Sequence, residues 1–192
     1  LHDQTDAAGR GAVQWIYQEA DRILGRTLAA MGPDDRLVVL SDHGFAPFRR
    51  AVNLNRALVD AGYLVLKPGR SESDMVFAAV DWSRSRAYAL GMNGVFINVK
   101  GRESAGIVDP AQVAQLKAQI MAELPALIDR DTGATIIRHV YDGSRAYRGD
   151  HTGDAPDIVV GYQSGYRASW ETVLGAVPPA LVYDNASRWS GD

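Results

Sequence analysis

The segment "RLVVLSDHGFAPFRR", from Arg36 to Arg50, holds the pattern that decides the fold class. Its part from Leu37 to Leu40 is continuously apolar, as is typical of a strand that is covered on both faces in a parallel sheet. Asp42 and His43 follow this run, and both side chains suit zinc or manganese. Ligands of an open α/β sheet bind beyond the carboxyl ends of its strands. We therefore expect Asp42 and His43 to lie together at that edge of the sheet, facing a polar cleft.

The composition fits one globular domain and excludes several classes of function. Of the 192 residues, 46% are hydrophobic, which is enough for a sizeable core. Charged residues make up 22% and the net charge is −3, so we expect neither a nucleic-acid surface nor a polybasic membrane patch. The chain contains no cysteine, which excludes disulfides, thiolate metal ligands and a cysteine nucleophile.

The sequence contains no membrane or targeting signal that we recognise. No apolar run approaches the roughly 20 residues that span a bilayer, and no charged-then-apolar leader opens the chain. We expect a soluble chain, whose compartment and oligomeric state the sequence does not fix. Both ends resemble cut ends, because the chain begins at Leu1 without a methionine and stops within the turn-like stretch "RWSGD". We therefore expect a piece of a longer protein, or a processed one.

Three segments show apolar residues at helical spacing between residues that commonly begin and end helices. The expected helices run from Thr5 or Asp6 to about Met31, from Asn53 to Gly62, and from Asp109-Pro110 to about Leu127. The apolar face of the third helix is predicted to contain Val113, Leu116, Ile120, Leu124 and Leu127.

Several short apolar segments predict strands that alternate with these helices. "YLVLK" reads as a short extended segment, and "RAYALG" and "GVFINVK" read as a hairpin around Met92-Asn93. "ATIIRHVY" and "DIVVGY" predict two further strands, residues 68–74 predict a flexible loop, and the last thirty residues look irregular. The alternation predicts an α/β fold with a mainly parallel sheet between helices, and an antiparallel excursion at residues 85–100.

The segment "VVLSDHGF" resembles the metal-binding segment of the alkaline phosphatase superfamily, in the branch of type I phosphodiesterases and nucleotide pyrophosphatases. "FAPFRRAVNLNRALVDAGYL", "DWSRSRAYALGMNGVFINVKGRE" and "DAPDIVVGY" resemble the continuation of bacterial members. The resemblance implies an alkaline-phosphatase-like α/β sandwich of which only part is present. Residues 1–192 would then be a single domain, the C-terminal portion of a larger catalytic domain.

The resemblance also implies hydrolysis of phosphodiester or pyrophosphate bonds at two divalent metal ions, zinc or manganese. The substrate would be a small phosphate ester or a nucleotide. Of the family's metal ligands, only Asp42 and His43 fall on this chain, and the nucleophilic Thr or Ser belongs upstream of Leu1. The last histidine ligand of that branch follows a "WSGD" stretch, which here ends the chain at Asp192. We expect the parent protein to be the enzyme and this chain alone to be inactive.

Two other classes of function remain open at this stage. The first is a phosphoglycerate mutase-like or sulfatase-like enzyme, which uses the same Asp-His segment within the superfamily. The second is a catalytically silent domain in which the fold is kept for binding or assembly. A Thr or Ser after an upstream strand, together with an Asp-x-x-x-His pair, would favour the enzyme.

Other residues could carry chemistry, but we favour structural interpretations for them. His151 lies among Asp150, Asp154 and Asp157, a composition that could bind a metal, although an exposed loop explains it equally simply. His139 alternates with apolar residues in a predicted strand. The remaining candidates are arginines that could contact phosphate and tryptophans that could stack on a nucleobase: Arg49, Arg50, Arg84, Arg86, Trp82, Trp170 and Trp189.

Overall fold

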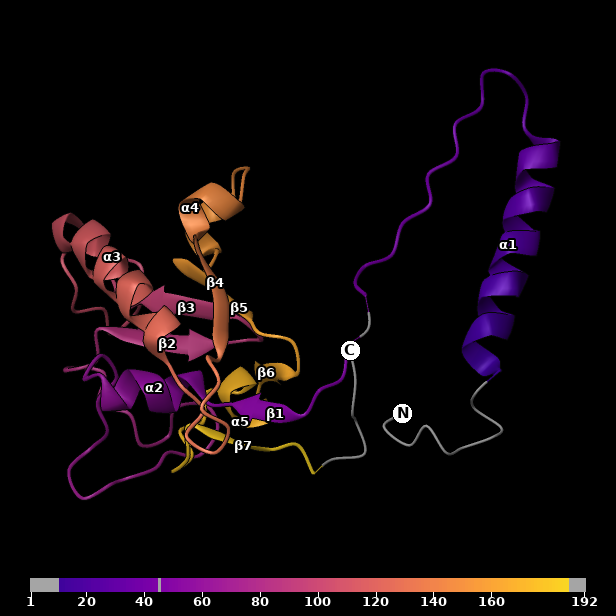
Figure 1. The fold of residues 1–192 in the computed structure, drawn as a ribbon. Coiled ribbons are helices and arrows are strands. Elements are labelled where there is room, and N and C mark those ends of the chain that lie inside the picture. The colour runs from indigo at the N-terminus through magenta and orange to yellow at the C-terminus, as the bar shows by residue number, and fades with distance from the viewer. Residues whose placement is uncertain (1–10, 45, 187–192) are drawn as a thin grey trace. The chain divides into compact units, whose positions relative to one another are not determined.

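The computed structural model describes residues 11–44 and 46–186, which fall into two compact units (Figure 1). The smaller, called here the N-terminal unit, comprises the described residues up to Pro47. The larger, called here the main unit, begins at Phe48.

The N-terminal unit contains one helix, α1 (Ala12–Ala30), among its described residues. This confirms the helix expected up to about Met31, whereas its predicted cap residues, Thr5 and Asp6, lie outside the described range. No residue of α1 is buried. The apolar side chains expected on its inner face are mostly exposed, as at Val13, Ile16, Tyr17, Ile23 and Leu28.

The prediction of a buried strand at Leu37–Leu40 is wrong for this chain. The segment forms no strand, and the exposed fraction of its residues rises from 38% at Leu37 to 81% at Leu40. A strand that is buried on both faces needs hydrogen-bonded neighbours and covering helices. No described strand pairs with this segment, so its apolar side chains remain in contact with solvent.

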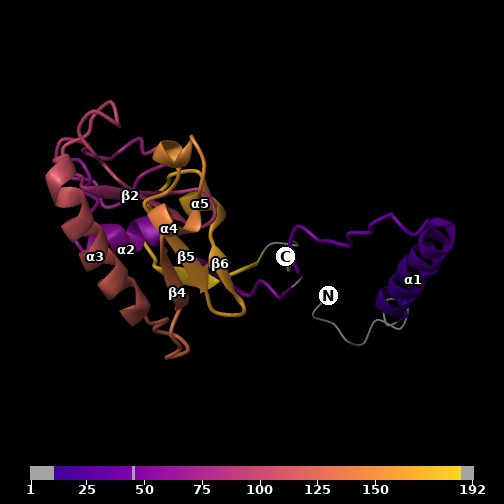
Figure 2. The ribbon, with the colours of Figure 1, turned by 90° about the horizontal axis from the view of Figure 1, so that it is seen from above.

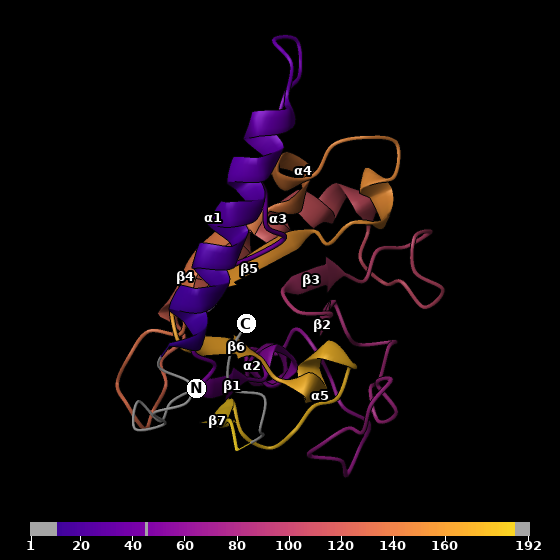
Figure 3. The ribbon, with the colours of Figure 1, turned by 90° about the vertical axis from the view of Figure 1, so that its right-hand side faces the viewer.

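The first of the two sheets in the main unit has three strands (Figure 3). β1 (Arg50–Val52) lies at its centre, parallel to β6 (Tyr166–Ala168) and antiparallel to β7 (Val182–Asp184). β6, β7 and the short helix α5 (Trp170–Val173) correct the expectation that the last thirty residues are irregular. Strands of three residues are too short to show an alternating pattern, and they form here because β1 lies between them.

The second sheet has four antiparallel strands in the order β2, β3, β5, β4. β2 (Ala87–Leu90) and β3 (Gly94–Ile97) form the predicted hairpin, in whose turn Gly91 takes a positive φ of 72°. β4 (Ile137–Asp142) and β5 (Ile158–Tyr162) confirm the two further strands predicted from the sequence. The apolar residues of these strands form much of the core.

The α/β class is confirmed, but the balance of strand directions differs from the expectation of a mainly parallel sheet. Among the named strands, β1 and β6 form the parallel pair and the other pairs are antiparallel. One reason is the short turn at residues 91–93, because only antiparallel strands can be joined by so short a connection.

Helices and single turns complete the main unit. α3 (Val113–Glu123) lies against one face of the four-stranded sheet (Figure 2) and confirms the third predicted helix. Its buried residues are Leu116 and Ile120, and Leu124 follows in η2. The remaining elements are α2 (Leu54–Asp60), η1 (Pro110–Gln112), η2 (Leu124–Ala126), α4 (Gly143–Ala146) and η3 (Thr152–Asp154).

Two polar residues that were predicted as helix caps behave differently. The Asp109 side chain accepts a hydrogen bond from the Ala111 N–H at 2.9 Å, as a capping residue should. Asn53 occupies the cap position of α2, but its side chain makes no capping hydrogen bond. Instead, its amide donates to the Ala180 carbonyl at 2.6 Å and accepts a hydrogen bond from the Ser169 hydroxyl, so it connects distant segments of the main unit.

An ion cluster around Arg50 joins β1 to two other parts of the main unit. The guanidinium donates to both carboxylate oxygens of buried Asp129, at 2.8 and 2.7 Å, and to Asp184 in β7 at 2.7 Å. It also donates to exposed Asp131 at 2.5 Å, and the Tyr166 hydroxyl donates to Asp129 at 2.9 Å. Burial raises the pKa of Asp129, but these hydrogen bonds outweigh burial and lower it to about 2.

A second ion pair holds α3 beside the end of β4. Lys117 donates to the Asp142 carboxylate at 2.7 Å, and the backbone N–H of Ser144 donates to the same oxygen at 3.0 Å. The Lys117 ammonium, followed by the Ser144 hydroxyl, lowers the pKa of Asp142 to about 2.

The Asp129→Asn variant should lower the free energy of unfolding by about 3 kcal/mol, because it leaves the Arg50 guanidinium without its buried bidentate partner. The matched control is Asp131→Asn, which removes the same charge beside the same arginine but at an exposed carboxylate. It should cost less than about 1 kcal/mol. Urea unfolding followed by circular dichroism measures both values, and equal losses would show that the buried geometry of Asp129 has no special weight.

Stability should fall as the pH is lowered from about 4 to 2. Both Asp129 and Asp142 have folded pKa values of about 2, below the ordinary value of 3.8, so their stabilisation is complete above that value and is lost as they are protonated. Each contributes about 2 kcal/mol at neutral pH. Urea unfolding at pH 5 and pH 2.5 should therefore show a smaller difference for Asp142→Asn than for the unaltered chain. An unchanged difference would contradict the role of Asp142.

Candidate metal centre

The Asp42 and His43 side chains lie close together at the end of the apolar segment. The His43 Nε2 atom is 3.5 Å from Asp42 Oδ2, which is longer than an ordinary hydrogen bond. Both side chains are exposed, with exposed fractions of 57% for His43 and 85% for Asp42. The two residues are adjacent in the chain, and the strand and sheet edge at which they were expected are not present among the described residues.

The local backbone fixes which nitrogen of His43 carries the proton. Nδ1 lies 2.8 Å from the Gly44 carbonyl oxygen, which can only accept a hydrogen bond, so Nδ1 is the donor. In the neutral ring Nε2 then carries the lone pair, which can accept a hydrogen bond or bind a metal. Histidine ligands of metal ions commonly donate their other ring N–H to a backbone carbonyl in this way. The Ser41 hydroxyl donates to the His43 carbonyl at 2.6 Å and further orders the turn.

The separation of the two donor atoms suits a shared ion. Nitrogen and oxygen ligands lie about 2.0–2.2 Å from zinc in a tetrahedral arrangement, which places two such ligands about 3.4 Å apart. The distance between His43 Nε2 and Asp42 Oδ2 is 3.5 Å. The separation is therefore compatible with two ligands of one divalent ion.

The pair alone does not make a complete metal centre. Among the residues that the structure describes, no group of three His, Cys, Asp or Glu side chains could hold a metal ion. Catalytic zinc sites usually have three protein ligands. Asp42 and His43 thus form at most a half-site, that is, two of the ligands that a complete centre needs. Gly44 is not required by crowding here, because an added Cβ would meet no atom within 4 Å.

Two further histidines, His139 and His151, lie in the main unit. The His151 side chain is 95% exposed, and its Nδ1 atom is 3.9 Å from Asp154 Oδ2, so it is a loop residue rather than part of a group of ligands. His139 lies exposed on β4, with its ring centre 5.8 Å from that of Tyr141. Asp157 directly precedes β5 and accepts hydrogen bonds from the Arg102 guanidinium at 2.6 and 3.1 Å.

The arginine and tryptophan candidates mostly have structural partners. Arg50 is engaged by three carboxylates, and the guanidinium of Arg86 lies 5.1 Å from the ring centre of Tyr63. Trp82 packs edge-on against Phe77 at 5.1 Å. Trp170 differs because it is half exposed, and Trp189 lies outside the described residues.

Comparison with known proteins identifies the family. The family described as type I phosphodiesterase / nucleotide pyrophosphatase matches residues 2–171, a range that includes Asp42 and His43. The chain belongs to this family. No curated protein and no solved structure gives a significant match.

Membership of the type I phosphodiesterase family indicates phosphoester hydrolysis in general. The family is generally metal-dependent and acts on small phosphate esters or nucleotides, and its match favours this branch over the mutase-like and sulfatase-like alternatives. Within the described residues, every helix is too short or too polar to cross a membrane.

The sequence interpretation missed the surroundings of Trp170. Glu72 and Asp74 were assigned to a flexible loop, yet both line a pocket together with Trp170 and Glu171. The sequence does contain a local indication of a binding surface here, because the apolar residues Met75 and Val76 directly follow that acidic stretch.

Zinc should bind weakly at Asp42 and His43, and the His43 ring should respond first. Long-range ¹H–¹⁵N spectra should show His43 protonated at Nδ1, with added zinc shifting its Nε2 resonance while those of His139 and His151 stay unchanged. Asp42→Asn should weaken this response roughly ten-fold or more, whereas His151→Ala should leave it intact. An Nε2-protonated His43, or a first response at His151, would contradict the half-site.

Proposed function

We propose that this chain is the part of a type I phosphodiesterase domain that carries Asp42 and His43 as ligands of one divalent metal ion. The family match over residues 2–171 carries the proposal, since the pair lies within it. The 3.5 Å separation of the donor atoms and the hydrogen bond of His43 Nδ1 to Gly44 support the assignment. Zinc suits this donor set, and manganese is the alternative.

The parent protein would hydrolyse phosphodiester or pyrophosphate bonds of a small phosphate ester or nucleotide. A Thr or Ser hydroxyl, which lies outside this chain, attacks phosphorus and forms a new P–O bond. The ester oxygen leaves with the electron pair of the broken bond and takes up a proton, and water then cleaves the phospho-enzyme. Two divalent ions would supply charge neutralisation when bound. The contribution of this chain would be to hold Asp42 beside His43, with the His43 ring in the tautomer that is protonated at Nδ1.

The exposed apolar surface of the N-terminal unit supports a larger parent domain. α1 has no buried residue, and Leu37–Leu40 is apolar without a sheet partner. Exposed apolar surface on this scale is uncommon in a finished domain. We propose that in the parent protein Leu37–Leu40 becomes a buried strand, paired with strands outside this chain, and so places the Asp-His pair at a sheet edge.

The chain alone should not hydrolyse bis(p-nitrophenyl) phosphate with added zinc or manganese, because it lacks the nucleophile. A longer form of the protein that includes the nucleophile should be active. In that form, Asp42→Ala and His43→Ala should each lower kcat/KM by roughly 100-fold, while His151→Ala changes it less than about two-fold. Turnover by the chain alone that is lost in Asp42→Ala would overturn the assignment of the nucleophile to a region outside this chain. Full activity of both substituted longer forms would overturn the metal-ligand role.

A further inference from the structure

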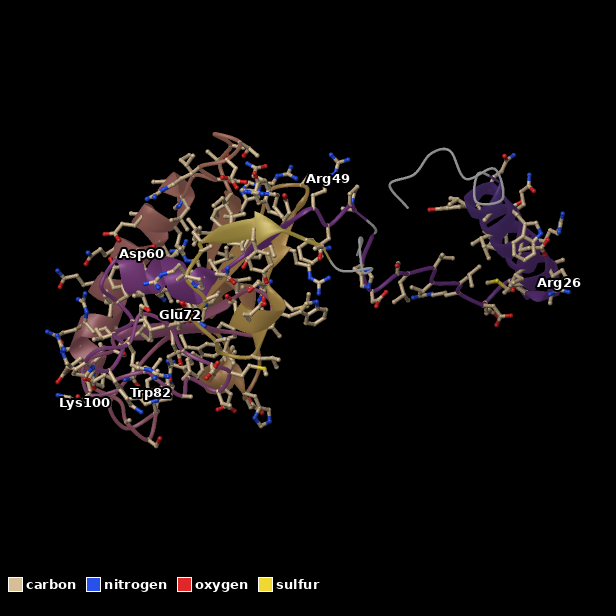
Figure 4. The ribbon with its side chains drawn as sticks, turned by 90° about the horizontal axis from the view of Figure 1, so that it is seen from below. Arg26, Arg49, Asp60, Glu72, Trp82 and Lys100 are labelled. Atoms are coloured by element: carbon tan, nitrogen blue, oxygen red, sulfur yellow. The ribbon has the colours of Figure 1, made fainter. Side chains whose placement is uncertain are left out.

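A pocket in the main unit lies between residues 72–75 and residues 170–178. Its volume is about 540 Å³, within the range of roughly 300–1,000 Å³ that is typical of small-molecule sites. Glu72, one of its lining residues, is labelled in Figure 4. The apolar part of the lining consists of Met75, Trp170, Leu174, Ala176, Val177 and Pro178.

Large apolar side chains gather around this pocket although they are accessible to solvent. Met75 is 54% exposed, Trp170 50% and Leu174 49%, and Val76 beside them is 84% exposed. Single exposed apolar residues are ordinary on a protein surface, but a contiguous group around a cavity commonly marks a binding site. The group therefore needs an explanation other than core packing.

Backbone hydrogen bonds hold the two walls of the pocket together. The N–H groups of Ser73 and Val177 each donate to the other residue's carbonyl, at 3.0 and 2.8 Å. The Val76 N–H donates to the Leu174 carbonyl at 2.8 Å. Val76 has a positive φ of 58°, which a β-branched residue rarely adopts, so this neighbouring bond helps to keep an unfavourable conformation in place. The pocket is thus a formed feature of the main unit.

The charged residues that line the pocket are all acidic. The carboxylates of Glu72, Asp74 and Glu171 line it, and no Lys, Arg or His is among its lining residues. Glu171 also accepts a hydrogen bond from the Tyr183 hydroxyl, while Glu72 and Asp74 are exposed. Acidic groups at the border of an apolar pocket complement a ligand that carries a positive charge on an apolar body.

Trp170 can contribute to the binding of such a cation. The Arg167 guanidinium already lies 4.8 Å from the Trp170 ring centre, within the range of a cation–π contact. The tryptophan remains half exposed despite this contact, so part of its surface is open at the pocket. Tryptophan is the aromatic side chain that attracts cations most strongly.

We propose that this pocket binds a small organic cation, an ammonium group on an aliphatic or aromatic body. The apolar body contacts Met75, Trp170 and Leu174, and the ammonium group lies near Glu72 and Asp74. A small molecule fits better than a protein segment because the volume matches small-molecule sites. This inference does not rest on the proposed phosphodiesterase function, and its test measures binding rather than turnover.

Three probes of equal chain length separate the contributions of charge and apolar contact. The 192-residue chain is titrated with hexyltrimethylammonium, hexan-1-ol and hexanoate by isothermal titration calorimetry. The cation should bind most tightly, the alcohol more weakly, and hexanoate not measurably, with the cation's affinity falling as salt is raised. Equal affinity for the cation and the alcohol, or no binding of the cation, would overturn the proposal.

Matched variants locate the binding. Glu72→Gln combined with Asp74→Asn should weaken binding of hexyltrimethylammonium about five-fold, and Leu174→Lys should abolish it by placing a positive charge at the pocket. The control is Asp150→Asn combined with Asp154→Asn, which makes the same charge change in an exposed loop and should leave binding unchanged. All substituted positions are exposed, and circular dichroism checks the fold. Equal weakening in the control would show a net-charge effect and overturn the site.

Discussion

The bidentate contact between Arg50 and Asp129 is the interaction on which the arrangement of the main unit depends most. Arg50 begins β1, the central strand of the three-stranded sheet, and Asp129 follows η2 in a different part of the chain. Asp184 brings β7 to the same guanidinium. This charge network, which is buried at Asp129 and partly buried at Arg50, therefore holds β1 in place, the strand at which the chain enters the main unit. Because the carboxylate of Asp129 is buried, it needs the Arg50 guanidinium as its partner. Removing either charge would leave the other one unpaired in a buried or partly buried position, which is strongly destabilising.

Local signals in the sequence predicted the elements that are stabilised locally. Asp109-Pro110 and the apolar spacing after it predicted α3, and two apolar segments around Met92-Asn93 predicted the hairpin. The prediction of a strand at Leu37–Leu40 was wrong because an apolar run indicates that burial is favourable, but it does not indicate which strands would pair with it. The Arg50 cluster could not be predicted, since its partners Asp129 and Asp184 are 79 and 134 residues away in the chain.

The difference between local and long-range contacts also applies to the Asp42–His43 pair and to the pocket beside Trp170. Asp42 and His43 are adjacent, so their sequence alone brings two donors within reach of one ion, and the neighbouring Gly44 carbonyl sets the histidine tautomer. A third ligand would depend on long-range folding, and no group of three candidate ligands occurs among the described residues. The pocket beside Trp170 depends on a long-range contact, the pairing of Ser73 with Val177, which the local pattern of acidic and apolar residues at 72–76 does not specify.

Hydrogen–deuterium exchange measures directly whether a folded main unit coexists with an unpaired ligand-bearing segment. In the 192-residue chain, the amides of β4 and β5 that bond across the sheet should exchange slowly, through opening of the main unit. The amides of Leu37–Leu40 should exchange at the rate of an unstructured peptide, because no described strand pairs with them. Slow exchange at Leu37–Leu40 would contradict this account, since it would require sheet hydrogen bonds that the segment does not make here.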